Sequence, residues 1–112
     1  MTTISQSQLV APVQLGSADA SFYNAPTSTS AKIGRAVFTN TTASAVTITA
    51  GITTGGALGA ATTMISARIL APGESYVSPE LAGAVIPPGS SLRAFASAVT
   101  SVTFTASGLI VQ

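Results

Sequence analysis

The sequence predicts an all-β fold, an antiparallel β-sandwich or jelly roll preceded by an extended N-terminal arm. Apolar and polar residues alternate with a period of two through most of the chain. No stretch has apolar residues at the helical spacings of three, four and seven over more than two turns. Turn signals separate the apolar runs at intervals of about ten residues, which is typical of sandwiches and jelly rolls.

Residues 1–31 form the expected arm, and residues 32–112 form the expected sandwich domain. The arm is rich in Ser, Thr, Gln and Ala, and Pro12 and Pro26 favour extended or edge backbone. Two alternatives stay open for it: a frayed terminus, or an extended strand that becomes ordered on a neighbouring subunit. In the second case its apolar anchors are Leu9, Val10, Val13, Phe22 and Tyr23.

The clearest strand signal lies in residues 33–52. Two alternating runs, 33–39 and 46–52, flank a polar segment, which predicts a β-hairpin that seeds the sheet. The Asn-Thr-Thr at 40–42 matches a glycosylation acceptor but is interpreted only as a polar turn. Residues 53–63 contain three glycines and are expected to form a mobile loop, without the Gly-Lys-Ser/Thr ending of a phosphate loop.

The second half of the chain repeats a strand, turn, strand pattern. Pro72-Gly73 and Pro88-Gly89 stand 16 residues apart. Proline sets the φ of the first central turn position, and glycine supplies the positive φ of the second. A meander or Greek-key path follows, and the last strand is expected to be long and central; the strands are expected at residues 64–70, 80–86, 91–97 and 102–110.

The alternation also assigns faces to individual side chains. Leu92 and Phe95 fall on opposite faces of one strand, so Phe95 is expected to contribute less to folding and more to assembly, whereas Phe104 is expected in the core. The expected core is Ile33, Val37, Phe38, Val46, Ile48, Ile52, Ile65, Ile69, Leu81, Ile86, Leu92, Phe104 and Ile110.

The composition excludes several classes of partner. Charged residues make up 6% of the chain and the net charge is +1, which is too weak to drive nucleic-acid binding. No apolar run approaches the roughly 18 residues of a membrane span, and residues 1–8 lack the features of a secretion signal. Because a nearly neutral surface with 46% hydrophobic residues tends to associate, we expect a homo-oligomer or a covering partner.

The inventory of reactive side chains predicts neither catalysis nor a cofactor. The chain has no histidine and no cysteine, so nucleophile–base pairs that use these residues and thiolate metal sites are excluded. A Ser or Thr nucleophile would have to rely on Lys32 or on one of the three carboxylates. Glu74 and Glu80 are interpreted as solvated loop charges, and the three carboxylates are too few for a metal cage. We therefore expect no catalytic, cofactor-binding or metal-binding residue.

The remaining candidate residues are interface candidates. Arg35, Arg68 and Arg93 lie in mid-strand, either as ordinary charges on a water-facing sheet or as residues that set the register at an interface. Tyr23 and Tyr76 are either packing residues or interface anchors, and the sequence leaves both alternatives open.

The pattern from residue 33 to the end resembles a group of small tailed-bacteriophage virion proteins. The resemblance rests on an apolar strand ending in Asn-Thr and resuming as Val-Thr-Ile, a Gly-rich loop, two Pro-Gly steps and a closing Ser-Val-Thr-Phe-Thr strand. These features occupy residues 38–48, 51–59, 69–75, 83–92 and 101–108.

This resemblance implies a β-sandwich subunit of a virion, with no catalytic residues to carry over. The favoured hypothesis is a capsid decoration, or cement, protein that binds the major capsid protein or other virion proteins and is assembled in the host cytoplasm. A tail, neck or fibre component is the second hypothesis. A carbohydrate- or peptide-binding module is the alternative of another class, and an enzyme comes last.

Overall fold

The structure, a computed structural model, describes residues 3–59 and 61–112. The first two residues of the expected arm and Ala60 of the expected loop lie outside the described residues. Within the described residues all regular structure is β, with nine strands and no helix. The strands are β1 (Ile4–Gln14), β2 (Ala20–Asn24), β3 (Ser30–Asn40), β4 (Val46–Thr53), β5 (Thr63–Leu70), β6 (Ser75–Val77), β7 (Val85–Ile86), β8 (Ser91–Ala96) and β9 (Val102–Val111).

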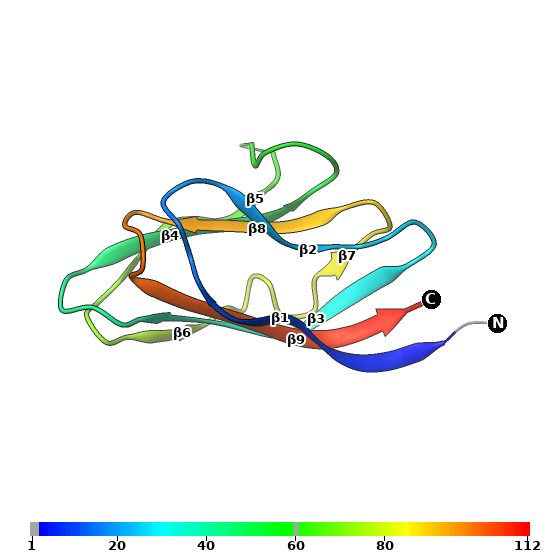
Figure 1. Ribbon diagram of the computed structural model, residues 1–112, viewed down its shortest axis with the longest axis horizontal. Coiled ribbons are helices and arrows are strands. Elements are labelled where there is room, and N and C mark those ends of the chain that lie inside the picture. Colours follow the sequence, from blue (N-terminus) through cyan, green and yellow to red (C-terminus); the bar gives the residue numbers. More distant parts are fainter. Residues whose placement is uncertain (1–2, 60) are drawn as a thin grey trace.

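The strands form two antiparallel sheets that pack face to face, which confirms the predicted sandwich (Figure 1). Sheet A has the order β1-β9-β3-β6, and β7 also pairs with β3. Sheet B has the order β2-β8-β4-β5. Only the β4–β5 and β6–β7 connections join strands of the same sheet. The other connections cross between the layers, so both sheets are built from strands distant in sequence.

The core lies between the layers and is centred on aromatic rings. Phe38 and Phe104 are fully buried and stack with their centroids 4.4 Å apart, and Phe22 meets Phe104 edge-on at 5.7 Å. Stacked and edge-on aromatic contacts of this kind stabilise a core beyond simple burial. Nine of the expected core residues are buried: Ile33, Phe38, Val46, Ile48, Ile65, Leu81, Ile86, Leu92 and Phe104.

The N-terminal segment differs from the arm expected for residues 1–31. β1 pairs with β9 at the edge of sheet A, and β2 pairs with β8 at the edge of sheet B. Leu9, Val10 and Leu15 are buried in the core of the same chain. A few apolar residues suffice at a sheet edge because backbone hydrogen bonds supply the rest of the attachment. The low apolar content that suggested an arm is therefore also compatible with two edge strands.

The expected hairpin of residues 33–52 is wrong, because its two strands belong to different sheets. β3 pairs with β9 in sheet A, and β4 pairs with β8 in sheet B. Residues 41–45 cross between the layers. A hairpin and an interlayer crossing require the same alternation, since in both cases one face of each strand is buried.

The crossing is anchored by the fully buried side chain of Asn40. Its Nδ2 donates to the carbonyls of Ser44 (2.8 Å), Leu70 (3.2 Å) and Ala71 (3.2 Å). Its Oδ1 accepts from the backbone N–H (3.0 Å) and hydroxyl (2.7 Å) of Thr42. One amide thus joins the end of β3 to the end of β5.

A bulge in β5 changes which side chains face the core. The register passes from Arg68 opposite Ile48 to Ile65 opposite Ala50, with Ala67 at a positive φ of 47°. The extra residue shifts the alternation. Leu70 is buried, and Ile69, expected in the core, is 67% exposed. Val37, Ile52 and Ile110 were also expected in the core and are only partly buried.

The two Pro-Gly turns are confirmed. Gly73 and Gly89 have φ values of 74° and 81°, and the N–H of Glu74 donates to the carbonyl of Ala71 across the first turn (3.0 Å). Each turn carries the chain from one sheet to the other instead of continuing a meander. The strand expected at residues 80–86 is limited to the two residues of β7.

Candidate interaction surfaces

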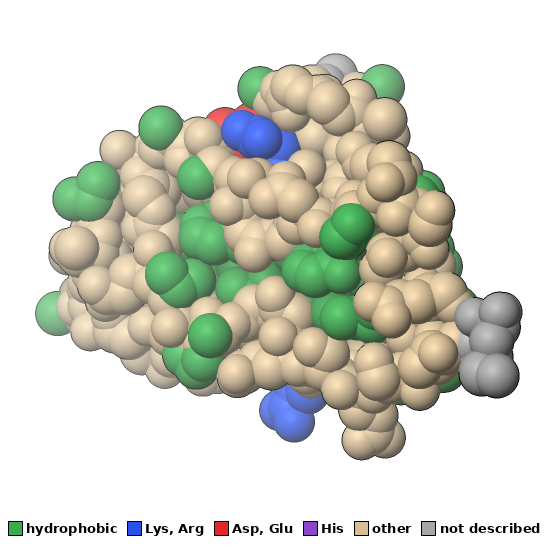
Figure 2. Space-filling view, turned by 45° about the vertical axis from the view of Figure 1, so that its right-hand side comes forward, with side chains coloured by type: hydrophobic (Ala, Val, Ile, Leu, Met, Phe, Trp, Pro, Cys, Tyr) green, Lys and Arg blue, Asp and Glu red, His purple; other side chains and the backbone are tan. Residues whose placement is uncertain are grey.

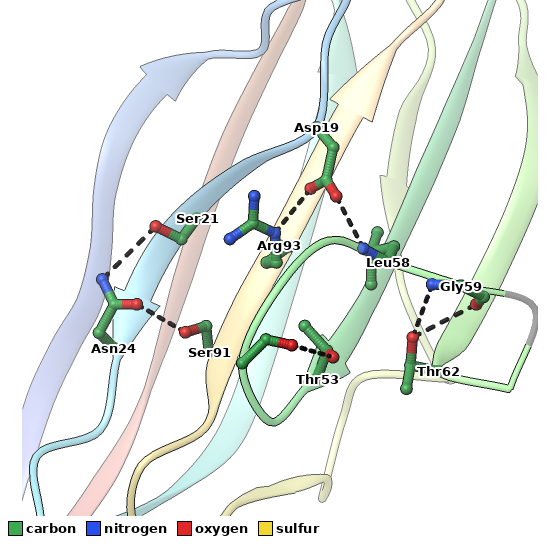
Figure 3. A network of polar contacts seen from close by, with 10 residues as sticks. Asp19, Ser21, Asn24, Thr53, Leu58, Gly59, Thr62, Ser91 and Arg93 are labelled. Carbon is green, nitrogen blue, oxygen red and sulfur yellow. Dashed lines mark hydrogen bonds and ion pairs between the residues drawn. The ribbon is translucent and has the colours of Figure 1, made fainter.

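An ion pair organises the outer face of sheet B (Figure 3). Arg93 of β8 donates through Nε to Oδ1 of Asp19, which lies between β1 and β2, at 2.9 Å. The other carboxylate oxygen accepts the N–H of Leu58 at 2.7 Å. The two side chains are 21% and 19% exposed. Asp19 thereby ties three segments together, and the charge of Arg93 is used within the chain.

The Gly-rich loop between β4 and β5 packs against a glycine. A Cβ on Gly51 would lie 2.1 Å from the carbonyl oxygen of Thr62, so only glycine allows this close approach. The hydroxyl of Thr62 accepts the N–H of Gly59 at 2.9 Å (Figure 3). The mobility expected for residues 53–63 stays a prediction, although these contacts and the Asp19 bond hold the described part of the loop over sheet B.

A second polar cluster closes one long side of the sandwich, where β5 of sheet B faces β6 of sheet A. The guanidinium of Arg68 lies 3.9 Å from the ring centroid of Tyr76, which is a cation–π contact. The hydroxyl of Tyr76 donates to Oε1 of Glu80, and Ser78 Oγ donates to the same oxygen at 3.2 Å. Tyr76 is therefore a packing residue that also carries a polar contact at the surface.

The cluster shifts two pKa values in opposite directions. Burial, followed by the hydrogen bond to Glu80, raises the pKa of Tyr76. The same hydrogen bond lowers the pKa of Glu80 because it stabilises the carboxylate. Glu74 likewise accepts a backbone N–H within its own turn (2.7 Å). The interpretation of Glu74 and Glu80 as solvated loop charges is therefore incomplete, because each carboxylate accepts a hydrogen bond within the chain.

The other interface candidates are spread over the molecule. Phe95 is half-buried on the outer face of β8, whereas Leu92 is buried, which confirms the predicted faces. Val13 is 38% exposed. Figure 2 shows hydrophobic atoms reaching the surface in a band between the two layers. Four of the five arm anchors are partly or fully buried within the chain: Leu9, Val10, Phe22 and Tyr23.

The outer face of sheet A contains a hollow of about 540 Å³, lined by residues 6–8 of β1, Gly34 of β3 and residues 107–109 of β9. A smaller hollow of about 280 Å³ shares Ser107 with it and is lined by Arg35, Val37 and residues 105–106. A Cβ on Gly108 would lie 1.9 Å from the carbonyl oxygen of Lys32. β3 and β9 lie close together here, at a bulge between Ile33 and Arg35, and the adjacent Gly34 and Gly108 leave a strip without side chains between the two strands.

Two cations flank this strip. Lys32 and Arg35 are exposed and alternate with the buried Ile33 and Ala36, so both leave the outer face of β3. Among the described residues the only ion pair within 4.0 Å is that between Arg93 and Asp19. Figure 2 shows the same contrast: blue atoms lie beside red atoms near the top, and blue atoms project alone from the bottom. No sequence signal marks the hollow, because the hollow depends on the pairing of β3 with β9.

The described residues contain no group of three His, Cys, Asp or Glu side chains that could hold a metal ion. No helix long and apolar enough to cross a membrane occurs in the same part of the chain.

Comparisons with known proteins find likeness at the level of the fold. No family model matches the chain, and no curated protein sequence matches it. A structure of infectious bursal disease virus, Gx strain, matches with a TM-score of 0.56 and 18% identity over 99% of this chain and 32% of that one. The crystal structure of the VP2 subviral particle of the same virus matches with a TM-score of 0.56 and 18% identity, over 98% and 32% of the two chains. The structure of the Gt strain of this virus matches with a TM-score of 0.55 and 17% identity, over 98% of this chain and 31% of that one. The chain thus spans about a third of these neighbours.

Proposed function

We propose that the protein is a structural component of a bacteriophage virion, and specifically a capsid decoration protein. The observation that carries this proposal is the likeness of nearly the whole chain to structures of a virus and of a subviral particle. The sequence features shared with small phage virion proteins direct the proposal toward phages. The partners are then the major capsid protein and further copies of this chain.

The surface supports a role in assembly. Only 6% of the residues are charged, so the surface is weakly self-repelling. Several large apolar side chains are exposed on strands and turns, and contact with other subunits would bury them. They are Ile4, Val13, Met64, Ile69, Val77, Val85 and Val99. Of the proposed interface residues, Val13 and Arg35 are exposed and Phe95 is half-buried, so all three are open to contact.

The carbohydrate-binding alternative receives less support from the structure. Sugar rings usually stack on exposed aromatic faces, and three of the aromatic side chains of this chain are turned into the fold. Tyr76 is buried beneath Arg68, and Phe22 and Tyr23 are partly buried and packed against the core. A tail, neck or fibre component shares the virion role and differs from a decoration protein in copy number and position.

Purified particles of the parent phage test the proposal. Quantitative mass spectrometry should find the chain in hundreds of copies per particle, in fixed ratio to the major capsid protein. A cryo-EM map should place it on the outside of the shell with the symmetry of the shell. A few copies at the vertex or tail would establish the tail alternative instead. Absence from particles, with the chain present in the infected cell, would refute a virion role.

A further inference from the structure

We infer that the outer face of sheet A binds an extended acidic segment of the shell protein, seated in the hollow around Ser107 and held by Lys32 and Arg35. The inference rests on the proposed virion role and adds the docking face and the chemistry of the partner. Three observations carry it: the shape of the hollow, the polar groups that line it, and the unequal distribution of charge between the two sheets.

The shape suits a chain that lies on the surface. The main hollow has a volume of about 540 Å³, within the range of about 300–1,000 Å³ of ligand sites. It continues through Ser107 into the smaller hollow beside Arg35. It is open to solvent, since it lies on a sheet face and not between the layers. A Cβ on Gly34 would make only ordinary contacts, the nearest at 3.5 Å from the carbonyl oxygen of Ser107, so a side chain placed there would fill the hollow without straining the sheet.

The lining offers hydrogen bonds but no charge of its own. Gln6 and Gln8 contribute amides, and Ser107 contributes a hydroxyl. Such groups can bond the backbone and carboxylates of an extended peptide. No aromatic side chain lines the hollow, which disfavours the stacking used by single-stranded nucleic acids.

The charge distribution selects an anionic partner. All three carboxylates have contacts away from this face: Asp19 with Arg93, Glu80 with Tyr76, and Glu74 within its own turn. Lys32 and Arg35 therefore give the face of sheet A a positive potential, which steers acidic segments and disfavours a second copy of the same face. Two cations are few for nucleic acid, where affinity grows with the number of phosphates neutralised. They are enough for a weak contact that many copies on one particle reinforce.

The test uses the full chain and a fluorescein-labelled Asp/Glu-rich dodecapeptide, followed by fluorescence anisotropy. The Lys32→Gln/Arg35→Gln double variant removes the two charges, and Gly34→Gln fills the hollow while leaving them in place. The control, Ala43→Glu/Ala45→Glu, lowers the net charge by the same two units at exposed positions of the β3–β4 crossing. Thermal unfolding verifies that each variant is folded.

We expect the two hollow variants, Lys32→Gln/Arg35→Gln and Gly34→Gln, to bind the acidic peptide at least about tenfold more weakly than the wild type. The Kd of the control variant should stay within about twofold of the wild-type value. Binding should weaken as salt rises, because the contacts are exposed, and an Asn/Gln-rich peptide of equal length should not bind.

Four results overturn the inference: no binding of the acidic peptide, equal affinity in either hollow variant, tighter binding of a single-stranded oligonucleotide, or self-association that is lost in the double variant. The mass spectrometry of particles tests the virion role itself, and its result does not depend on any of these four results. A chain abundant on particles whose double variant still saturates them would refute this docking face and leave the virion role intact.

Discussion

Replacement of Asn40 by alanine tests whether a single amide holds the two layers together at the β3–β4 crossing. The side chain is fully buried and all its polar atoms are satisfied by five contacts. In Asn40→Ala the carbonyl of Leu70, which accepts in a buried contact, loses this partner. An unpaired buried group costs about 1–3 kcal/mol. The remaining contacts are partly buried and are expected to contribute about 0.5–1 kcal/mol each where water cannot replace them.

These contributions sum to at most about 3–7 kcal/mol. Because water replaces part of the partly buried contacts, we expect a loss of about 3–5 kcal/mol in the free energy of unfolding. This is a large part of the roughly 5–15 kcal/mol of a typical domain and corresponds to a fall of about 10–20 °C in Tm for a chain of this size. Urea unfolding followed by circular dichroism gives the difference directly, provided that the m-value is unchanged.

Asn24 supplies the matched control, because it is an exposed asparagine that also makes side-chain hydrogen bonds, to Ser21 and Ser91. Asn24→Ala should cost less than about 1 kcal/mol. Asn40→Asp keeps the acceptor for Thr42 but turns a carboxylate toward three carbonyls, so it should be at least as destabilising as alanine at pH 7. An Asn40→Asp protein of wild-type stability, or equal losses from Asn40→Ala and Asn24→Ala, would show that the amide donors do not hold this crossing.

Three further results are expected. Phe104→Ala should cost about 3–5 kcal/mol, because the ring is buried and stacked, and Phe95→Ala clearly less; equal melting temperatures in the two variants would contradict the assigned faces. Removal of residues 2–29 should leave a chain without cooperative unfolding, since β1 and β2 complete both sheets; a folded, β-rich product would restore the arm hypothesis. The lowered pKa of Glu80 means that its stabilising contribution is present above the ordinary value of 4.5 and is lost as the pH falls through the lowered value. Glu80→Gln should therefore reduce the loss of stability on acidification, measured as urea midpoints from about pH 6 to about pH 3. An identical dependence of the midpoint on pH in the wild type and the variant would show that the hydrogen bond from Tyr76 to Glu80 does not contribute to acid sensitivity.

The features that the sequence predicted correctly are local ones. The period of two identified strands, and the Pro-Gly pairs identified turns whose glycines have the expected positive φ. The faces of Leu92, Phe95 and Phe104 followed from the same alternation. These features depend on steric preferences that act over a few residues.

The features that the sequence did not predict depend on distant pairing. Alternation does not specify which sheet a strand joins, so the pattern of residues 33–52 predicts a hairpin where the chain crosses between the layers. The bulge at Ala67 has no glycine to mark it, and it reversed the assignment of Ile69. The pairing of Asp19 with Arg93 spans 74 positions in the chain. The hollow on sheet A likewise exists only because two glycines from distant strands meet.

The position of β9 in the centre of sheet A has a consequence for the order of folding. β9 lies between β1 and β3, and its register joins Ile4 to Val111. During synthesis, at about 5–20 residues per second, the first and third strands have no common neighbour until the last strand has left the ribosome. Pairings over such long separations in sequence fold slowly, in about milliseconds to seconds. Until then the edges of β1 and β3 are open to other chains, so the yield of soluble protein should depend on synthesis rate and temperature more than on the final stability of the sandwich.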